Sequence, residues 1–445
     1  MQHESVQISE KYNRYFFAWL TLIVVFIIAN LFVDYAALLA LAISVLLVIF
    51  QDNTCSYSLM FFLLPFAQIF KISMMPTSLF TIIEMVFIIK RIFMSKLRIK
   101  PIFCFLSVLT CFVILISSLI SENFSFSELL KTFMYYAILG FFVKDYVPEH
   151  YFGYVRCFTI GMLLSSLLAL PEGIREKMYM LSGGSQDTTW NSVFGNTNRF
   201  SGAMTDANYY VLMLIVVLGL NLVLIFTHKT SCLSKLTVLC LFVFGLFTYS
   251  KSYYLLVSIL VIIVFYILLI NQKIGKFLFG VLCVLAILTF VGTMNFEFIQ
   301  VMILRFVQSS GNMDTFTTGR TLIWRDYWNY ISSSYKCLLI GDGNGAPYIC
   351  GGATHNMYIE IIYKVGIIGL ILYLVTFLYP IRIKKGIDKR YFINYFLYFL
   401  VGIAYFFLAG FNSYELVFYF ISCWMISNLN IKSSNKKNHY GEYCE

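Results

Sequence analysis

Long apolar runs recur along almost the whole chain and are separated by short polar connections. A helix needs about 20 apolar residues to cross the ~30 Å hydrocarbon core of a bilayer. By that criterion the pattern predicts twelve to fourteen transmembrane helices, the shortest at 35–50 and 57–73. The fourteen predicted spans are 15–33, 35–50, 57–73, 77–93, 101–120, 128–146, 151–170, 207–227, 234–250, 252–270, 276–294, 357–379, 391–409 and 413–430. We therefore expect an all-α polytopic membrane protein in which residues 1–445 form a single integral membrane domain.

Composition agrees with this fold class and excludes others. The chain is 60% hydrophobic and only 12% charged, about half the charged fraction of a soluble protein, and its mean hydropathy is +0.80. These values exclude a soluble enzyme, a disordered chain and a nucleic-acid-binding domain. The net charge of +10 needs no acidic partner, because Lys and Arg accumulate in the cytoplasmic loops of membrane proteins.

The positions of Lys and Arg predict the orientation in the membrane. Basic residues gather in short connections, which we assign to the cytoplasm: 90–100, 229–235, 273–276, 382–390 and the tail after 430. With fourteen spans, the number of spans between successive basic connections puts all of these connections on the same side of the membrane. The same pattern puts both termini in the cytoplasm. The polar N-terminal segment lacks a signal-peptide cleavage site, so the first apolar run is expected to stay as an anchor. Two polar segments then lie on the outer side, a first loop at 171–206 and a large loop at 295–356, in which we expect short helices.

Histidine narrows the search for a reactive group, because the chain has only five. His355 alone falls on the predicted outer side, where the span 357–379 begins. A neutral imidazole near pH 7 can take a proton from a sugar hydroxyl, although a histidine at the entrance of a helix is, taken alone, more often just an interfacial polar residue. Shortly before it, a turn with Gly341 and Gly343 either allows close backbone approach to a ligand or is a flexible loop. The turn lacks the lysine and helix of a P-loop, so nucleotide binding is not predicted.

The large loop also contains two arginines. Arg320 and Arg325 have the planar guanidinium fork that suits phosphate oxygens. The same stretch is also typical of an interfacial amphipathic helix that Trp324, Tyr327 and Trp328 anchor at headgroup depth. Both interpretations can hold together.

Other charged residues stand at the outer ends of predicted spans. Arg199 and Asp206 precede the span 207–227, where they bind an anion or pair with each other. Lys251 lies between two apolar spans, which is costly unless the cation snorkels or has a partner. The basic groups Arg199, Lys251, Arg320 and Arg325 are therefore expected to converge on the outer face.

Three further features bear on chemistry. Glu360 and Lys364 have the i,i+4 spacing of a helix ion pair, and we expect them to neutralise each other. Cys337 and Cys350 flank the glycine turn, and their spacing leaves open whether they form a disulfide in an oxidising periplasm. No Cys and His cluster has metal-ligand spacing, so neither a metal site nor a cofactor is predicted.

The order of these motifs resembles the O-antigen ligase/polymerase superfamily (Wzy and WaaL). The resemblance covers roughly residues 195–380 and rests on these segments: Arg199…Gly202…Asp206-Ala207-Asn208, Gly319-Arg320…Trp324, Leu339-Ile340-Gly341-Asp342-Gly343, Thr354-His355-Asn356-Met357-Tyr358-Ile359-Glu360 and Gly366…Gly369. Ser250-Lys251-Ser252 stands where many members have Ser-Arg-Gly. Lysine keeps the charge there but loses the bidentate phosphate geometry.

The resemblance implies a metal-independent glycosyltransferase that uses undecaprenyl-diphosphate-linked oligosaccharides at the outer face of the bacterial inner membrane. It implies that His355 takes the proton of the acceptor hydroxyl and that Arg320 stabilises the diphosphate leaving group. Substrate or diphosphate binding is then expected of Arg199, Lys251, Arg325, Asp206, Asn356, Gly341 and Gly343. Membrane lipids are further partners, and a chain-length regulator and a flippase are partners that the resemblance leaves open.

Within this family we favour an O-antigen polymerase, because the Tyr358-Ile359-Glu360 continuation and the general divergence look more like one. The first alternative is an O-antigen ligase, whose acceptor is lipid A-core. The second is a lipid-linked oligosaccharide flippase. Transporters place charges at mid-membrane and are often built from two repeated halves, whereas here polar residues concentrate at one face and no half-repeat is visible.

Overall fold

The computed structural model describes residues 2–72, 77–94, 101–182, 199–204, 206–227, 231–270, 319–349, 353–379 and 414–428, together with scattered positions between 275 and 314. Within these residues every regular element is a helix. The all-α class is confirmed for the described part of the chain.

Six of the described helices are long and apolar enough to cross a membrane. They are α5 (Pro101–Ile120), α6 (Phe126–Asp145), α7 (Tyr151–Leu168), α10 (Ala207–Thr227), α12 (Lys251–Ile270) and α18 (Met357–Leu378). Shorter apolar stretches lie in α1 (Gln2–Ala29), α2 (Ala36–Phe50), α11 (Cys232–Leu246) and α20 (Tyr414–Asn428). The chain is a polytopic integral membrane protein. The predicted span 391–409 and most of 276–294 lie outside the described residues, so the total of twelve to fourteen spans stays a prediction.

The predicted helix at 57–73 is wrong in its second half. The segment forms α3 (Asn53–Leu63), the short 3-10 helix η1 (Leu64–Phe66) and then turns and bends over 67–72, and α4 (Leu79–Met94) is the next described helix. Pro65 lies in η1, and proline cannot continue an α-helix because it lacks an N–H group. Irregular backbone at membrane depth is tolerated when protein surrounds it. That condition is met here, because α3 and η1 pack against α7 and are almost completely buried.

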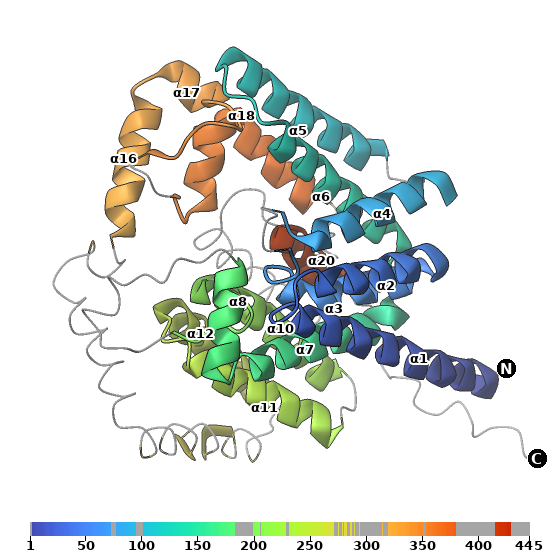
Figure 1. Cartoon of the computed structure of the whole chain (residues 1–445). Coiled ribbons are helices and arrows are strands. Elements are labelled where there is room, and N and C mark those ends of the chain that lie inside the picture. The colour runs from blue at the N-terminus through green and yellow to red at the C-terminus, as the bar shows by residue number, and fades with distance from the viewer. Residues whose placement is uncertain are drawn as a thin grey trace, which may run out of the picture.

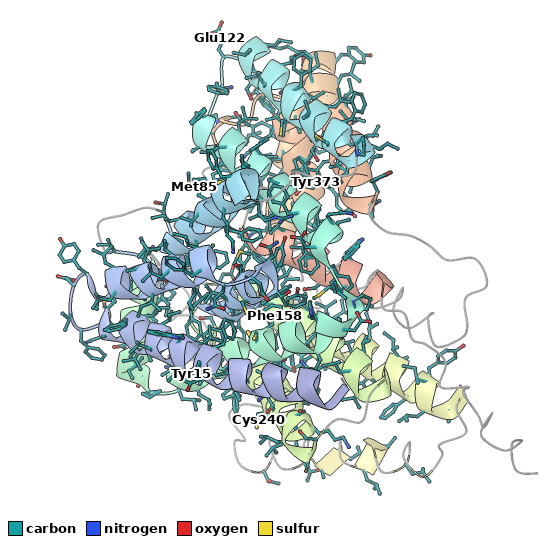
Figure 2. The ribbon with its side chains drawn as sticks, turned by 90° about the vertical axis from the view of Figure 1, so that its right-hand side faces the viewer. Tyr15, Met85, Glu122, Phe158, Cys240 and Tyr373 are labelled. Carbon is teal, nitrogen blue, oxygen red and sulfur yellow. The ribbon has the colours of Figure 1, made fainter. Side chains whose placement is uncertain are left out.

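The helices gather into two groups that α6 and α20 join (Figure 1). In one group, α18 packs against α5 and against α16 (Arg320–Ser332) and α17 (Tyr335–Ile340) of the predicted large loop. In the other, α10 packs against α7, α11 and α12, and α8 (Glu172–Ser182) contributes Met178 to the main hydrophobic core. Figure 2 shows Phe158 of α7 deep among packed side chains, whereas Glu122 projects beyond the end of α5.

Helix α18 is broken at Gly366, where φ is 70° and ψ is 179°. The carbonyls just before a break lose their intrahelical donors and need others. The glycine turn supplies these donors. The Asp342 N–H donates to the Tyr363 carbonyl at 2.8 Å, and the Gly343 N–H donates to the Lys364 carbonyl at 2.9 Å. The predicted large loop is thereby fastened to the span that follows it.

The same turn is fastened on its other side to the connection between α5 and α6. The Asn344 amide nitrogen donates to the Ser125 carbonyl at 2.9 Å, and its amide oxygen accepts from the Ser125 N–H at 2.9 Å. The Gly345 N–H donates to the Asn123 carbonyl at 2.9 Å. Of the two sequence interpretations, a flexible loop is therefore wrong, because the turn is a packed element between two spans.

Candidate functional site

His355 stands directly before α18 in an unusual backbone conformation. Its φ is 46°, in the left-handed region that residues other than glycine seldom adopt. The next residue, Asn356, caps α18, because its side-chain oxygen accepts from the N–H groups of Tyr358 and Ile359 at 3.1 and 3.3 Å. The cap fixes where the helix begins, and the imidazole before it is half-buried.

Arg320 is the first residue of α16. The helix begins after Gly319, whose φ of 81° turns the chain into it, and the Gly319 N–H donates to the Asp314 carbonyl at 2.7 Å. Arg320 is half-buried. Within the described part of the chain, no hydrogen bond or ion pair holds its guanidinium group.

Arg199 and Asp206 lie at the start of α10, on a segment remote in sequence from α16 and α18. The Asp206 carboxylate accepts from the Asn208 N–H at 2.7 Å and so caps α10. The Arg199 guanidinium donates to the Thr248 carbonyl at 3.2 Å and to the Asn208 amide oxygen at 3.4 Å. Arg199 and Asp206 are both half-buried. Of the two alternatives that the sequence left open for them, a direct ion pair is not formed within 4.0 Å.

The electrostatics join these residues into one site. Burial lowers the pKa of His355, the Arg320 cation lowers it further, and the carboxylates of Asp206 and Glu360 oppose both. Burial also lowers the pKa of Arg320, against the opposing Asp206 charge. The pKa of Arg199 is lowered by burial and by Arg320, again with Asp206 opposing. The Asp206 charge therefore acts on His355, Arg320 and Arg199, the Arg320 charge acts on His355 and Arg199, and the imidazole is biased towards its neutral form.

Lys251 and Arg325 stand in different relations to this cluster. Lys251 is the first residue of α12, and the serines on both sides of it, Ser250 and Ser252, donate to the same Asn208 amide oxygen at 3.0 and 3.4 Å. Lys251 is thus tied to the segment that holds Arg199. Arg325 instead makes an exposed ion pair with Asp314 at 3.2 Å and is not among the charges that shift the pKa of His355.

Gly341 and Gly343 have positive φ values of 85° and 91°. A Cβ atom on Gly341 would meet the Val365 backbone at 2.4 Å, and one on Gly343 would meet the Asn123 carbonyl at 2.5 Å. The close approaches that these glycines permit are therefore to the chain's own backbone. Ligand contact by them stays a prediction.

The other sequence predictions have mixed outcomes. Glu360 and Lys364 form an ion pair at 3.2 Å, as expected. Tyr327 was expected at headgroup depth, but it is fully buried and packs against Tyr363, because α16 lies on the first half of α18. Cys337 is buried, and Cys350 lies outside the described residues. Whether the two form a disulfide therefore stays open. Among the described residues no group of three or more His, Cys, Asp or Glu could hold a metal ion.

Two polar residues of this region were not predicted as site residues. Asn208 accepts from Arg199 and from the serines beside Lys251, and Thr354 is completely buried next to His355. Asn208 follows a helix-capping aspartate by two residues, and Thr354 precedes a helix-capping asparagine by two. Capping patterns at the outer ends of spans would have drawn attention to both.

A comparison with family models supports the resemblance. Residues 236–374 match the family model Wzy_C, which is described as O-antigen ligase. The matched segment includes Arg320 and His355 and leaves out Arg199 and Asp206. The match supports the O-antigen ligase/polymerase superfamily and does not separate a polymerase from a ligase. No curated protein and no solved structure matches the chain.

Proposed function

We propose that this membrane protein is a polysaccharide polymerase that joins undecaprenyl-diphosphate-linked oligosaccharide repeat units into O-antigen or capsular polysaccharide. The reaction takes place at the periplasmic face of the bacterial inner membrane. The observation that carries the proposal is the cluster of Arg320, Arg199, Asp206 and His355, which three separate segments bring together.

The charges of this cluster favour an anionic ligand. Two guanidinium cations, those of Arg320 and Arg199, face the single Asp206 carboxylate, and the neighbouring imidazole is biased towards neutrality. An excess positive charge in a partly buried place is costly unless an anion compensates it. The diphosphate of a lipid-linked sugar would supply that anion, and a guanidinium group can bind phosphate oxygens in a bidentate manner.

The same residues suit glycosyl transfer. The bond between the anomeric carbon of the donor sugar and the diphosphate oxygen breaks, and its electron pair goes to the diphosphate. Arg320 and Arg199 stabilise the charge that develops there. A hydroxyl oxygen of the acceptor forms the new bond to the anomeric carbon and loses its proton to His355, whose lowered pKa keeps the imidazole free to accept it.

A ligase is the second candidate, because the matched family model is described as O-antigen ligase and the match does not separate the two activities. Its chemistry at the donor is the same, because the leaving group is again a lipid diphosphate. Only the acceptor differs, a second lipid-linked repeat unit for a polymerase and lipid A-core for a ligase.

A flippase is the third candidate, and the break in α18 is a feature that transporters share. In transporters the freed backbone groups of broken helices coordinate ions or substrate. Here the carbonyls of Tyr363 and Lys364 accept from the N–H groups of the loop, so the break serves to hold the loop in place. The transporter interpretation is therefore the weakest of the three.

The test is a lipopolysaccharide ladder on a gel. A deletion strain is complemented with the wild type, His355→Ala, Arg320→Ala or the control Arg175→Ala, each at checked expression. Arg175 lies on α8, where it forms a loose pair with the exposed Glu172 at 3.5 Å. We expect the control to restore the ladder and the two site variants to leave only a core with one repeat unit.

Other outcomes lead to other functions. Bare core together with accumulated lipid-linked polymer identifies a ligase. Full ladders from both His355→Ala and Arg320→Ala contradict the proposed site and favour the transporter.

A further inference from the structure

Each oxygen of the Glu360 carboxylate has its own partner, and Lys364 pairs with only one of them. Oε1 lies 3.2 Å from the Lys364 ammonium. Oε2 lies 3.1 Å from the Thr354 hydroxyl, whose single proton it shares with the Asn356 carbonyl at 3.0 Å. Thr354 and Glu360 are 0% and 1% exposed. A buried carboxylate is retained at a cost, so a second specific contact of this kind points to a role beyond neutralising a lysine.

Thr354 in turn encloses His355. The Thr354 hydroxyl oxygen accepts from the Asn356 N–H at 3.2 Å, which closes a side-chain turn around the histidine. On the other side, the Trp324 indole N–H of α16 donates to the Thr354 carbonyl at 2.8 Å. The left-handed backbone of His355 is thus held from both neighbouring residues. Such a conformation costs about 1–3 kcal/mol and persists only when its surroundings enforce it.

Resting on the proposed function, we infer that Thr354 and Glu360 are positioning residues that hold the His355 imidazole within reach of Arg320 and of the acceptor hydroxyl. Neither touches substrate, because both are buried. Thr354 sets the backbone of His355, and Glu360 fixes the Thr354 hydroxyl. The hydrogen bond from Trp324 to the Thr354 carbonyl connects this turn to α16, the helix that begins with Arg320. It thereby positions His355, the proposed proton acceptor, relative to Arg320, the proposed cation at the leaving group.

Three charges act on His355 from the elements around it. They are Arg320 at the start of α16, Asp206 before α10, and Glu360 on α18. Arg320 lowers the imidazole pKa, and the two carboxylates raise it. Removing Glu360 therefore lowers the imidazole pKa further, whereas a purely structural role of Glu360 would leave it unchanged.

The first test compares Thr354→Val with Thr354→Ser. Valine has nearly the shape of threonine but loses the hydroxyl contacts with Glu360 and with the Asn356 carbonyl and N–H groups, whereas serine keeps the hydroxyl. We expect Thr354→Val to lower the rate of chain extension about a hundredfold, the loss that follows a misplacement on the order of 1 Å. The KM for the lipid-linked donor should change little, and Thr354→Ser should extend chains nearly as the wild type does.

The second test needs no substrate. The full-length protein in detergent carries histidine labelled with carbon-13, and the His355→Ala variant identifies the His355 signal among the five histidines. Thr354→Val should move this signal, and Thr354→Ser should restore it. The double variant Glu360→Gln/Lys364→Met, which leaves no unpaired lysine, should lower the imidazole pKa, because it removes a carboxylate that opposes the lowering.

These readouts separate the inference from the proposed function. If His355→Ala retains a full ladder, the proposed function is wrong, yet the His355 signal still tests the positioning. The inference is overturned if Thr354→Val matches the wild type in the His355 signal and in chain extension. Should Thr354→Val fail to fold, an unchanged imidazole pKa in the double variant overturns the inference in the same way.

Discussion

Two opposing sets of charges meet at His355. Burial and the Arg320 cation lower its pKa, and Asp206 and Glu360 raise it. An imidazole in such a field remains neutral until the pH falls below the ordinary value near 6.5. A reaction that needs the neutral form therefore keeps its rate through mild acidification and loses it as the pH falls through the lowered pKa.

Asp206→Asn tests this balance at a single residue. Asparagine keeps an oxygen that can accept from the Asn208 N–H but removes a negative charge. Because that charge raises the pKa of His355, its loss should lower the pKa and move the acidic limb of the activity profile to lower pH. The measurement is polymer formation by membrane preparations across a pH series.

The control is Glu172→Gln, which removes a carboxylate from α8 whose side chain is 69% exposed. It should leave the acidic limb in place. A shift to higher pH in Asp206→Asn would contradict the assignment of His355 as the group that must be neutral.

Among the elements, α18 departs most from a regular helix. Gly366 interrupts it, and the loop turn at 341–343 supplies the donors that the break requires. The carbonyl of Leu339 approaches so closely that a Cβ atom on Gly366 would lie 2.1 Å from it. The break and the loop therefore form one structural unit, and a side chain at Gly366 would separate them.

Gly366→Ala should destabilise the protein for two reasons. The positive φ costs a residue with a side chain about 1–3 kcal/mol, and the overlap with backbone atoms adds to that. We expect a lower apparent melting temperature in detergent and a weaker ladder in complemented cells.

The matched control is Gly153→Ala on α7, where an added Cβ meets nothing within 4 Å. That substitution should be neutral or slightly stabilising, since alanine favours a helix over glycine by about 1 kcal/mol. Equal melting temperatures for the two variants would show that the break does not require glycine.

Across the whole molecule, polar contacts gather in separate sets. One set includes Arg91 and Asp145, which pair at 2.9 Å, and Asn53, which donates to Asp145 at 3.2 Å. Another joins Asn123 and Asn344 to their neighbours near the glycine turn. The predicted alternation of spans puts the first set on the cytoplasmic side and the second on the outer side. Within each of these two sets, the residues in contact are predicted to lie on the same side of the membrane.

The segment 57–73 still fits the predicted alternation of spans, although its second half is not an α-helix. Its beginning lies beside Asp145 through Asn53 and Tyr57. Its end is bonded to the outer end of the first predicted span, because the Asn30 side chain donates to the Lys71 carbonyl at 3.0 Å. The segment still connects the two ends of the bundle, although only part of it is helical.

The absolute orientation can be tested with cysteine substitutions at exposed positions on the two predicted sides. Glu122, which projects beyond α5 (Figure 2), is predicted to be periplasmic, and Glu149 is predicted to be cytoplasmic. A membrane-impermeant maleimide should label Glu122→Cys in intact spheroplasts and Glu149→Cys only after permeabilisation. The wild type, with its eleven cysteines, sets the background. The reverse labelling pattern would invert the topology.

Sequence alone determined the class of the protein, and it predicted the alternation of its spans and the candidate chemistry at Arg320 and His355. These follow from local properties, namely the length of an apolar run, the bias of Lys and Arg in short loops, and the presence of rare titratable groups on one side. Such properties are the same whatever the helices later contact.

Only the tertiary structure decided which charges meet. It joined Arg199 and Asp206 to Arg320 and His355 and left Arg325 paired with Asp314. In the tertiary structure the glycine turn packs against the break in α18, and Thr354 is buried beside His355. Helix α3 also ends earlier than the apolar run predicts. Each of these outcomes depends on contacts between segments far apart in the chain. The free energy of such contacts comes from packing and hydrogen bonding, which no local pattern contains.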